Sequence, residues 1–190
     1  RGSGASLQEK EECLLEEDDA DMLTETLNNQ VDRWVIRHVF GEGVEPLAHA
    51  VLDIWQADAN GHYRHPADPR AADADPEFPC YGRASTGGGG RFSFRTIMPG
   101  RVAVAATGTD AAGALQAPHI LVSVMARGIM TRCWTRIYFA DRENENAADP
   151  VLRLVPEARR GTLLARPAGP GLYRIAVRLQ GEGETVFLDA

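Results

Sequence analysis

The 190-residue sequence predicts an all-β fold, an antiparallel β-sandwich with long loops. Three observations point to it: short apolar runs of strand length recur along the chain, Gly and Pro separate them, and no ten-residue helical period interrupts them. The pattern is clearest at 172–179, where Tyr173, Ile175, Val177 and Leu179 alternate with charged or smaller residues. A period of two residues is typical of a strand with one buried face.

The candidate strands follow one another from residue 34 onward, each bounded by turn residues. They are 34–40, 50–56, 92–97, 119–126, 133–140, 172–179 and 185–189. The segment 65–90 contains four prolines, so we expect a long irregular loop there. Within it, the glycine run 87–90 predicts a hairpin loop rather than a phosphate-binding loop, because a strand pattern follows it and not a helix.

Charge divides the chain into two parts. Residues 1–30 hold nine acidic and two basic residues, which accounts for the whole formal net charge of -7. The remainder balances, with 27 - 9 = 18 acidic and 20 - 2 = 18 basic residues. We therefore expect an acidic, mobile N-terminal segment over 1–30 and a single domain over 31–190. A neutral domain with an acidic tail lacks the basic footprint that nucleic acid requires, so we expect no nucleic-acid partner.

The sequence lacks the signals of membrane and secreted proteins. Its longest apolar run, 120–126, is much shorter than the roughly 18 residues that a membrane span needs. No apolar stretch near the amino terminus resembles a secretory signal. The cysteines, Cys13, Cys80 and Cys133, are odd in number and widely spaced, which favours free thiols over a disulfide framework. We therefore expect a cytoplasmic protein that is not bound to a membrane.

Several short segments carry a resemblance to a known family. Residues 55–63 read Trp-Gln-Ala-Asp-Ala-Asn-Gly-His-Tyr, residues 94–100 read Phe-Arg-Thr-Ile-Met-Pro-Gly, and residues 117–121 read Ala-Pro-His-Ile-Leu. Together with weaker matches at 126–129, 135–139 and 179–187, they resemble the intradiol ring-cleaving dioxygenases over roughly residues 33–190. The resemblance implies the β-sandwich of that family, with long excursions between the strands.

The resemblance also implies an iron site of which only half remains. The four ligands of the family, two tyrosinates and two histidines, fall on Tyr63, Val102, His119 and Leu121. Ferric iron favours phenolate and imidazole donors, and the aliphatic side chains of Val102 and Leu121 offer neither. Tyr63 and His119 are then vestigial ligand positions, and we expect this chain to hold no metal of its own.

Within the family, this half-empty pattern resembles the iron-free alpha chains that pair with a homologous beta chain carrying Fe(III). The resemblance implies that such an assembly uses O2 to cleave 3,4-dihydroxybenzoate between its two hydroxyls. The product is 3-carboxy-cis,cis-muconate, an intermediate of aromatic catabolism by the beta-ketoadipate pathway. The resemblance also implies an alpha-beta hetero-oligomer in which this chain alone is not catalytic.

For one residue of this chain, Arg127, the resemblance implies a substrate-binding role. The arginine of the family's Ala-Arg-Gly element, here Arg127, reaches across the subunit boundary toward the pocket of the partner. A guanidinium group suits the carboxylate of 3,4-dihydroxybenzoate, either through direct contact or through its field. Candidates for the subunit interface are Met125, Met130, Trp134 and Arg136.

Two other functions fit the same residues. One is a homo-oligomeric intradiol dioxygenase with non-standard iron ligands, and the other is a catalytically inactive module that binds a small molecule. His62 and His65 lie close to Tyr63 in the sequence, but their spacing does not direct them to one side, so we expect them on the loop surface. Tyr63 and His119 are expected to be hydrogen-bonded remnants of an ancestral site.

Overall fold

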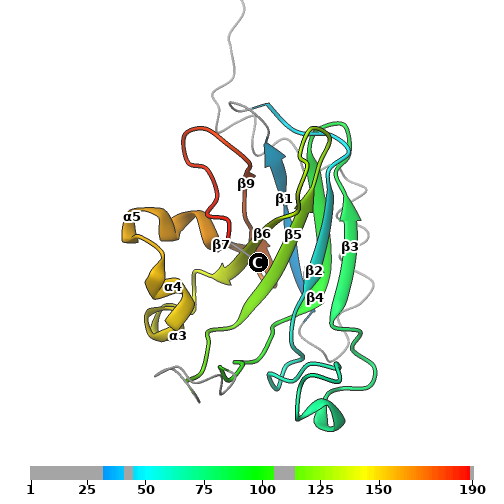
Figure 1. The fold of residues 1–190 in the computed structure, drawn as a ribbon, viewed down its shortest axis with the longest axis vertical. Helices are drawn as coiled ribbons and strands as arrows, with labels where there is room; N and C mark the ends of the chain where they lie inside the picture. The colour runs from blue at the N-terminus through cyan, green and yellow to red at the C-terminus, as the bar shows by residue number, and fades with distance from the viewer. Residues whose placement is uncertain (1–31, 41–44, 105–113, 189–190) are drawn as a thin grey trace, which may run out of the picture. The chain divides into compact units, whose positions relative to one another are not determined.

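A computed structural model of the chain describes residues 32–40 as backbone and residues 45–104 and 114–188 with their side chains. The segment 1–30, expected to be mobile, and Cys13 within it lie outside the described residues. The described part is mainly β (Figure 1). Its strands are β1 (Asp32–Phe40), β2 (Val51–Trp55), β3 (Tyr81–Ser85), β4 (Arg91–Ile97), β5 (His119–Met125), β6 (Cys133–Phe139), β7 (Leu164–Gly169), β8 (Leu172–Arg174) and β9 (Val177–Arg178).

The strands form one curled sheet that supplies both layers of a sandwich. Its order is β3-β2-β5-β6-β7-β8-β1-β4, and β9 pairs with β1. Leu52, Val122 and Ile137, from β2, β5 and β6, belong to the same buried cluster as Phe92 of β4 and Tyr173 of β8. The two halves of the sheet therefore share one core, as facing sheets of a sandwich do. The predicted fold class is confirmed.

Not every pair of neighbouring strands is antiparallel. Strand β2 is antiparallel to β3 and β5, β5 to β6, β7 to β8, and β1 to β4. Three pairs run parallel instead, namely β6 with β7 and β1 with both β8 and β9. A parallel pair needs a long crossover. Between β6 and β7, three short helices provide it: α3 (Glu143–Ala148), α4 (Pro150–Leu154) and α5 (Glu157–Arg160).

Most of the predicted strands are present, with four differences. Strand β3 lies inside the segment expected to be an irregular loop. Its residues alternate between exposed and half-buried, so the sequence shows no apolar period there that would predict a strand. Strand β7 contains Pro167 and a register shift, both of which hide a strand in the sequence. The predicted strand 172–179 is interrupted between β8 and β9, and the predicted strand 185–189 is reduced to one bridge between Trp134 and Leu188.

The glycine run 87–90 forms a tight turn between β3 and β4. Gly90 N donates to Gly87 O at 2.9 Å, and Gly87 N donates to Arg91 O at 3.1 Å. These strands lie at opposite ends of the sheet order, so the turn joins the two layers and is not the loop of a paired hairpin. The expected hairpin is therefore wrong, whereas the turn is followed by strand β4 and not by a helix, as expected.

Asp149 fixes the helical crossover to the sheet. Its carboxylate caps α4 by accepting from Leu152 N at 2.7 Å, and it also accepts from Ala117 N at 2.8 Å and from the Tyr138 hydroxyl at 3.2 Å. The residue is fully buried, so each of these bonds offsets the cost of removing a carboxylate from water. Asp149 thereby holds the start of β5, where the Pro-His-Ile segment lies, against the helices.

Candidate functional site

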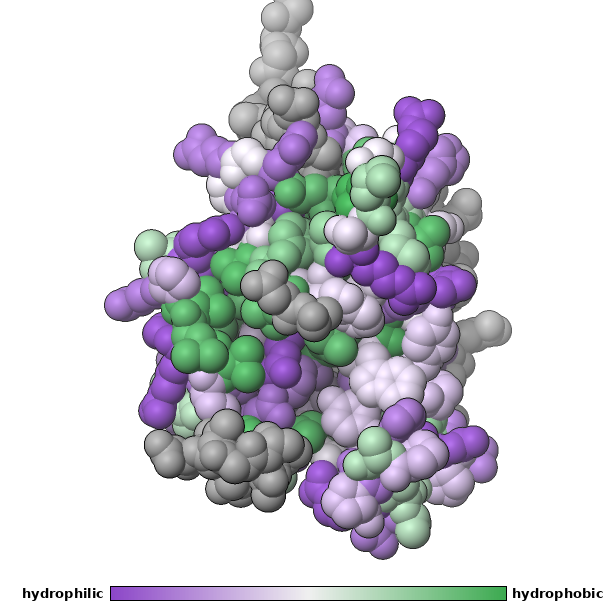
Figure 2. Space-filling model, in the orientation of Figure 1, coloured by the Kyte–Doolittle hydropathy of each residue, from purple (hydrophilic) through white to green (hydrophobic). Residues whose placement is uncertain are grey.

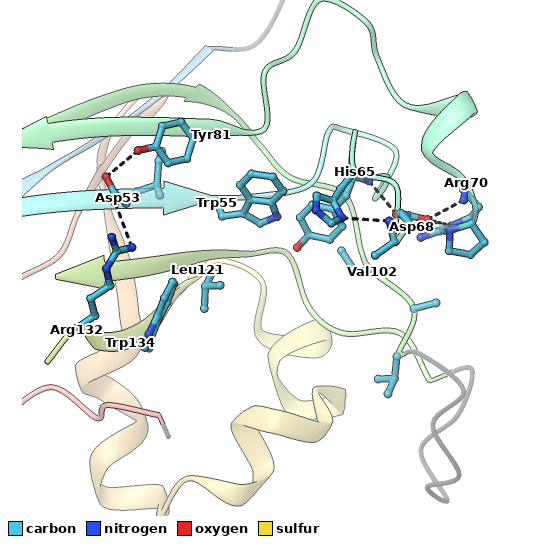
Figure 3. A pocket seen from close by; sticks show the side chains of 16 residues that line it. Asp53, Trp55, His65, Asp68, Arg70, Tyr81, Val102, Leu121, Arg132 and Trp134 are labelled. Carbon is cyan, nitrogen blue, oxygen red and sulfur yellow. Dashed lines mark hydrogen bonds and ion pairs between the residues drawn. The ribbon is translucent and has the colours of Figure 1, made fainter. Parts of the chain in front are cut away.

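The outer face of the central strands forms the floor of a cavity of about 770 Å³. Cross-strand pairs align Asp53 with Ser123 and Trp134, and Trp55 with Leu121 and Arg136, on the face opposite the core. Figure 3 shows the cavity from close by, with the loop that follows β2 as its second wall. Its lining residues are Asp53, Ile54, Trp55, Tyr63, His65, Ala67, Asp68, Pro69, Arg70, Tyr81, Val102, Ala103, Val104, Leu121, Arg132 and Trp134.

Three of the four predicted ligand positions line this cavity, and the fourth is buried. Tyr63, Val102 and Leu121 come from three different segments of the chain and converge there. His119 does not contribute to the lining, and its side chain is only 4% exposed. The fold thus brings together Tyr63 and Leu121, which lie 121 - 63 = 58 residues apart in the sequence.

A buried carboxylate, Asp58, shapes the loop that carries Tyr63. Its Oδ1 accepts from the backbone N–H groups of Asn60 and His62 at 2.9 Å, and its Oδ2 accepts from Asp75 N at 2.9 Å. Burial alone would raise the pKa of Asp58, but these backbone donors hold it below its usual value. The carboxylate therefore stays charged and fixes both ends of the loop around Tyr63.

Two glycines bring the segment with Val102 against the same loop. Gly100 N donates to Asp58 O at 2.8 Å, and a Cβ at Gly100 would lie 2.3 Å from Gly61 N. Gly61 has a φ of +83°, and a Cβ there would lie 2.0 Å from Arg101 O. Only residues without a side chain permit this approach, which sets the distance between Tyr63 and Val102.

Tyr63 packs by its ring and not through its hydroxyl. The ring is stacked on Trp55, with centroids 6.1 Å apart and planes at 12°. Its backbone N–H donates to Asp68 Oδ2 at 2.9 Å, whereas the hydroxyl has no hydrogen-bond partner among the described residues. Burial raises the pKa of Tyr63, and the positive charge of Arg136 offsets this only in part. The phenol is therefore held in its neutral form, and the expected hydrogen bond of this side chain is not present in the described part.

His119 lies in the interior beside Tyr138, with ring centroids 5.8 Å apart. Its Nδ1 lies 2.8 Å from Ala117 O, which fits an Nδ1–H that donates to this carbonyl. Burial and then the charge of Arg136 lower the pKa of His119 to about 4. The imidazole is therefore neutral at ordinary pH, because both burial and the nearby positive charge of Arg136 disfavour its protonation.

Arg136, which sequence reasoning assigned only to a subunit interface, lies beside the site without lining the cavity. One guanidinium nitrogen, Nη1, donates to Gln116 Oε1 at 2.7 Å and lies 3.5 Å from the Tyr138 hydroxyl. Its Nε is buried without a hydrogen-bond partner in the described part of the chain. Because Arg136 stands directly across from Leu121, its charge lies on the cavity face of the sheet.

A second polar group closes one end of the cavity around Asp53. The carboxylate accepts from Arg83 Nε at 2.5 Å, from Arg83 Nη2 at 2.9 Å and from the Tyr81 hydroxyl at 3.0 Å. Arg132 lies 3.8 Å from the same carboxylate. The hydrogen bonds from Arg83 are the largest cause of the lowered pKa of Asp53. No sequence signal marked this cluster, because Asp53 lies alone within an otherwise apolar strand.

The opposite end of the cavity is formed by the loop residues His65, Asp68 and Arg70 (Figure 3). His65 is exposed, as expected, but its ring meets the edge of Trp55 at 6.0 Å and lines the cavity. His62 points elsewhere, with Nδ1 3.3 Å from Asp73 O. The two histidines therefore do not act together, although one of them belongs to the cavity rim.

The residues present do not fit a ferric ion. Within residues 45–104 and 114–188, no group of three or more His, Cys, Asp or Glu side chains could hold a metal. Val102 and Leu121 present carbon atoms where the resemblance expects donors. Tyr63 is neutral and His119 is engaged with a carbonyl. The mostly apolar, aromatic lining is instead typical of a cavity for a small organic molecule.

Arg127 lies apart from this cavity, in the turn that follows β5. Ile129 N donates to Ala126 O at 3.1 Å, and Gly128 has a φ of +90°, a conformation that favours glycine. Arg127 is exposed and has no bonded partner among the described residues. The predicted ligand positions lie near the opposite end of the strand, so Arg127 is not part of the pocket of its own chain.

Three further expectations concern residues outside the cavity. Cys80 and Cys133 are free thiols, as predicted, and both belong to the described part of the chain. No helix in the described ranges is long and apolar enough to span a bilayer. Met130, expected at a subunit interface, is 99% exposed.

Comparisons with known proteins agree with this architecture. Residues 14–168 match the family described as dioxygenase. Over 161 residues the chain is 40% identical to the protocatechuate 3,4-dioxygenase alpha chain of Burkholderia cepacia, covering 82% of this chain and 75% of that protein. The beta chain of the same organism is 34% identical over 132 residues, covering 70% and 54%. Catechol 1,2-dioxygenase from Pseudomonas arvilla C-1 superposes with a TM-score of 0.57 at 20% identity, over 83% of this chain and 54% of that one, which is a similarity of fold.

Proposed function

The chain belongs to the intradiol dioxygenase family, and we propose that it is the iron-free alpha subunit of a protocatechuate 3,4-dioxygenase. The observation that carries the proposal is the pair of aliphatic side chains, Val102 and Leu121, which line the cavity at two of the four ligand positions of the family. An enzyme of this family needs non-haem Fe(III), so a chain without the donors requires a partner that has them. The higher identity to an alpha chain than to a beta chain supports the same assignment.

In this proposal, a homologous beta subunit binds the iron and the reaction takes place in its pocket. The substrates are 3,4-dihydroxybenzoate and O2, and both oxygen atoms enter the product, 3-carboxy-cis,cis-muconate, as the bond between the hydroxyl-bearing carbons breaks. The alpha chain contributes its surface and the charges on it. Figure 2 shows apolar side chains gathered over the region of α4 on one face of the molecule. Leu154 of this helix is 84% exposed, which favours burial against a second chain.

The loop between β5 and β6 supports a contact with substrate across the boundary. Arg127 and Met130 both project from it and both are exposed. An exposed Met can anchor the loop in an apolar recess of the partner, while the unbonded guanidinium remains available for the substrate carboxylate. We assign to Arg127 the recognition of that carboxylate.

Co-expression with a four-ligand beta chain tests the proposal. We expect a stable complex with one iron per alpha-beta pair and intradiol cleavage of 3,4-dihydroxybenzoate, whereas this chain alone should be colourless. If light scattering shows a monomer in the presence of the beta chain, the second candidate replaces the first. That candidate is a module binding a small molecule, which the largely apolar cavity of about 770 Å³ favours.

Replacement of Arg127 by Ala tests the role of this residue in the assembled enzyme. The catalytic efficiency for 3,4-dihydroxybenzoate should fall by about 1.5–3 kcal/mol, the usual contribution of a hydrogen bond to a charged group. Catechol, which has no carboxylate, should lose much less. Equal losses for the two substrates would mean that Arg127 shapes the subunit contact instead of binding substrate.

A further inference from the structure

A second pocket, formed around strands β7, β8 and β9, is lined by three arginines. Its volume is about 430 Å³, and its lining includes Arg166 of β7, Arg174 of β8 and Arg178 of β9. The residue before each of these arginines belongs to the buried core, so the arginines themselves lie on the outer face of the strands. The pocket shares no lining residue with the cavity around Tyr63. It is therefore a separate, strongly basic site.

Two of the arginines lie directly opposite each other. Arg166 and Arg174 are cross-strand neighbours in the antiparallel pair of β7 and β8. Like charges in this arrangement destabilise a sheet. Within residues 45–104 and 114–188, neither guanidinium has a hydrogen bond or a carboxylate within 4.0 Å, and no Asp or Glu lines the pocket. The fold therefore keeps two cations side by side without supplying an anion between them.

The third arginine is oriented by the turn that follows β9. Arg178 Nη1 donates to Glu182 O at 2.8 Å, and Arg178 N donates to Thr185 Oγ1 at 2.9 Å. Gly183 has a φ of +71°, and a Cβ there would lie 3.2 Å from Arg178 Nη1, so the turn packs closely against the guanidinium. The position of Arg178 at the pocket is thus fixed by backbone groups of its own turn.

We propose that this pocket binds an organic anion that carries two or more carboxylate or phosphate groups. A guanidinium fork binds either group through two parallel hydrogen bonds. Arg174 and Arg178 are four residues apart, so up to about 13 Å of chain separates their Cα atoms. One anionic group can then lie at the Arg166–Arg174 pair and a second near Arg178. The volume is that of a small-molecule site, and Leu164 and Pro167 offer apolar contacts for a carbon skeleton. The inference does not depend on the assignment as an alpha subunit.

Calorimetric titration of the full chain tests the proposal and identifies the anionic group. The probes are citrate for carboxylates and fructose 1,6-bisphosphate for phosphates, with acetate and inorganic phosphate as their single-group counterparts. We expect one of the two larger probes to bind once per chain and at least about tenfold more tightly than its single-group counterpart. Its affinity should fall as sodium chloride is added, because salt screens the charges of an open pocket. If neither larger probe binds more tightly than its counterpart, the proposal is overturned.

Two matched double variants separate this pocket from the overall charge of the chain. R166Q/R174Q should weaken binding of the favoured probe at least about tenfold. R132Q/R153Q removes two exposed arginines outside the pocket, so it changes the net charge equally and should keep the affinity. An equal loss in both variants would reduce the binding to net charge and reject a defined site.

The arginine pair also makes a prediction for the protein without ligand. Because R166Q/R174Q removes the repulsion between opposed cations, thermal unfolding in the absence of an anion should show a variant at least as stable as the parent chain. Should the double variant unfold, R166Q alone removes the exposed member of the pair, and an unchanged affinity of R166Q for the probe would equally reject the proposal. A Gln variant that binds the probe normally but no longer assembles with a beta chain would show that the arginines form a protein interface instead.

Discussion

The two faces of the same three strands, β2, β5 and β6, have different physical characters. Toward the core, Leu52, Val122 and Ile137 are completely buried and belong to one apolar cluster. On the opposite face, Leu121 and Trp134 border a cavity of about 770 Å³ and are only partly buried. Because successive side chains of a strand point to opposite sides, one face of the sheet can keep its apolar packing while metal-binding side chains are replaced on the other.

This difference explains how a chain can lose a metal site and keep its fold. Interior packing is dense, so each methylene removed from the core lowers stability. A residue beside a cavity makes fewer contacts, so its replacement costs less stability. A leucine at position 121, on the outer face, therefore leaves the packing of the inner face unchanged. The following predictions test how far the two faces are independent.

The largest effect is expected from a leucine on the inner face. Leu52→Ala removes a side chain that is 0% exposed and should lower the free energy of unfolding by about 4 kcal/mol. The same replacement at Leu121, which faces the cavity on the adjacent strand, should cost less than about 1 kcal/mol. Urea unfolding of the two variants measures both values. Similar losses would mean that the outer face is packed as tightly as the core.

The next effect concerns a close backbone contact that leaves no room for an added atom. Gly100→Ala puts a Cβ 2.3 Å from Gly61 N, so backbone must move, and we expect a loss of about 3 kcal/mol. Gly88→Ala is the control, because a Cβ there has no atom within 4 Å and should leave stability unchanged or slightly raised. Thermal unfolding distinguishes them. A neutral Gly100→Ala would show that this contact does not fix the loop around Tyr63.

His119 should make stability depend on pH between about 6.5 and 4. Burial, then Arg136, lowers its pKa from 6.5 to about 4, so in this range the unfolded chain binds a proton that the folded chain does not. Stability should therefore fall by about 2 to 3 kcal/mol as the pH decreases through this range. Denaturant unfolding at pH 7, 6, 5 and 4 measures the loss, and His119→Gln should flatten the dependence. The carboxylates with lowered pKa values, Asp53, Asp58 and Asp68, contribute only at still lower pH.

The smallest effect is expected from a buried hydroxyl on the outer face. Ser123 is 1% exposed and its Oγ has no hydrogen-bond partner in the described residues, so Ser123→Ala should be neutral or stabilise by up to about 1 kcal/mol. Thr135 on the inner face donates to Val186 O at 2.7 Å, so Thr135→Val should cost roughly 1–2 kcal/mol. A destabilising Ser123→Ala would indicate that a ligand or water bonds to this hydroxyl and contributes to the folded state.

The strands that form the inner face could be predicted from the sequence, because their apolar pattern lies within a few consecutive residues. The apolar run 120–126 has the length of a strand and predicts one without reference to the rest of the chain. Strand β3 could not be predicted, because its extended structure depends on pairing with β2 and its sequence shows no apolar period. The parallel partners of β6 and β1 depend on crossovers, which leave no periodic signal.

The candidate site was predictable only where a family motif marks it. Tyr63, Val102 and Leu121 were recognised from their motifs, and the structure brings all three to one cavity. Arg136 was assigned to an interface, because the sequence does not tell which face of a strand receives a given charge when the neighbouring strands are unknown. Asp53 and its partners were missed for the same reason, since Arg83 and Arg132 are remote in sequence and meet Asp53 only after the strands pair.

The turn at residues 86–90 offers a point for protein fusion. Thr86 anchors its start by accepting from Ala50 N at 2.8 Å and donating to Leu47 O at 2.7 Å, while Gly87, Gly88 and Gly89 are exposed with no atom near a prospective side chain. Because loop closure becomes only slowly more costly with length, a fluorescent reporter inserted after Gly88 on flexible linkers should leave both layers intact. The turn lies outside the cavity lining and outside the β5–β6 loop, so such a fusion could follow assembly with a partner without altering either.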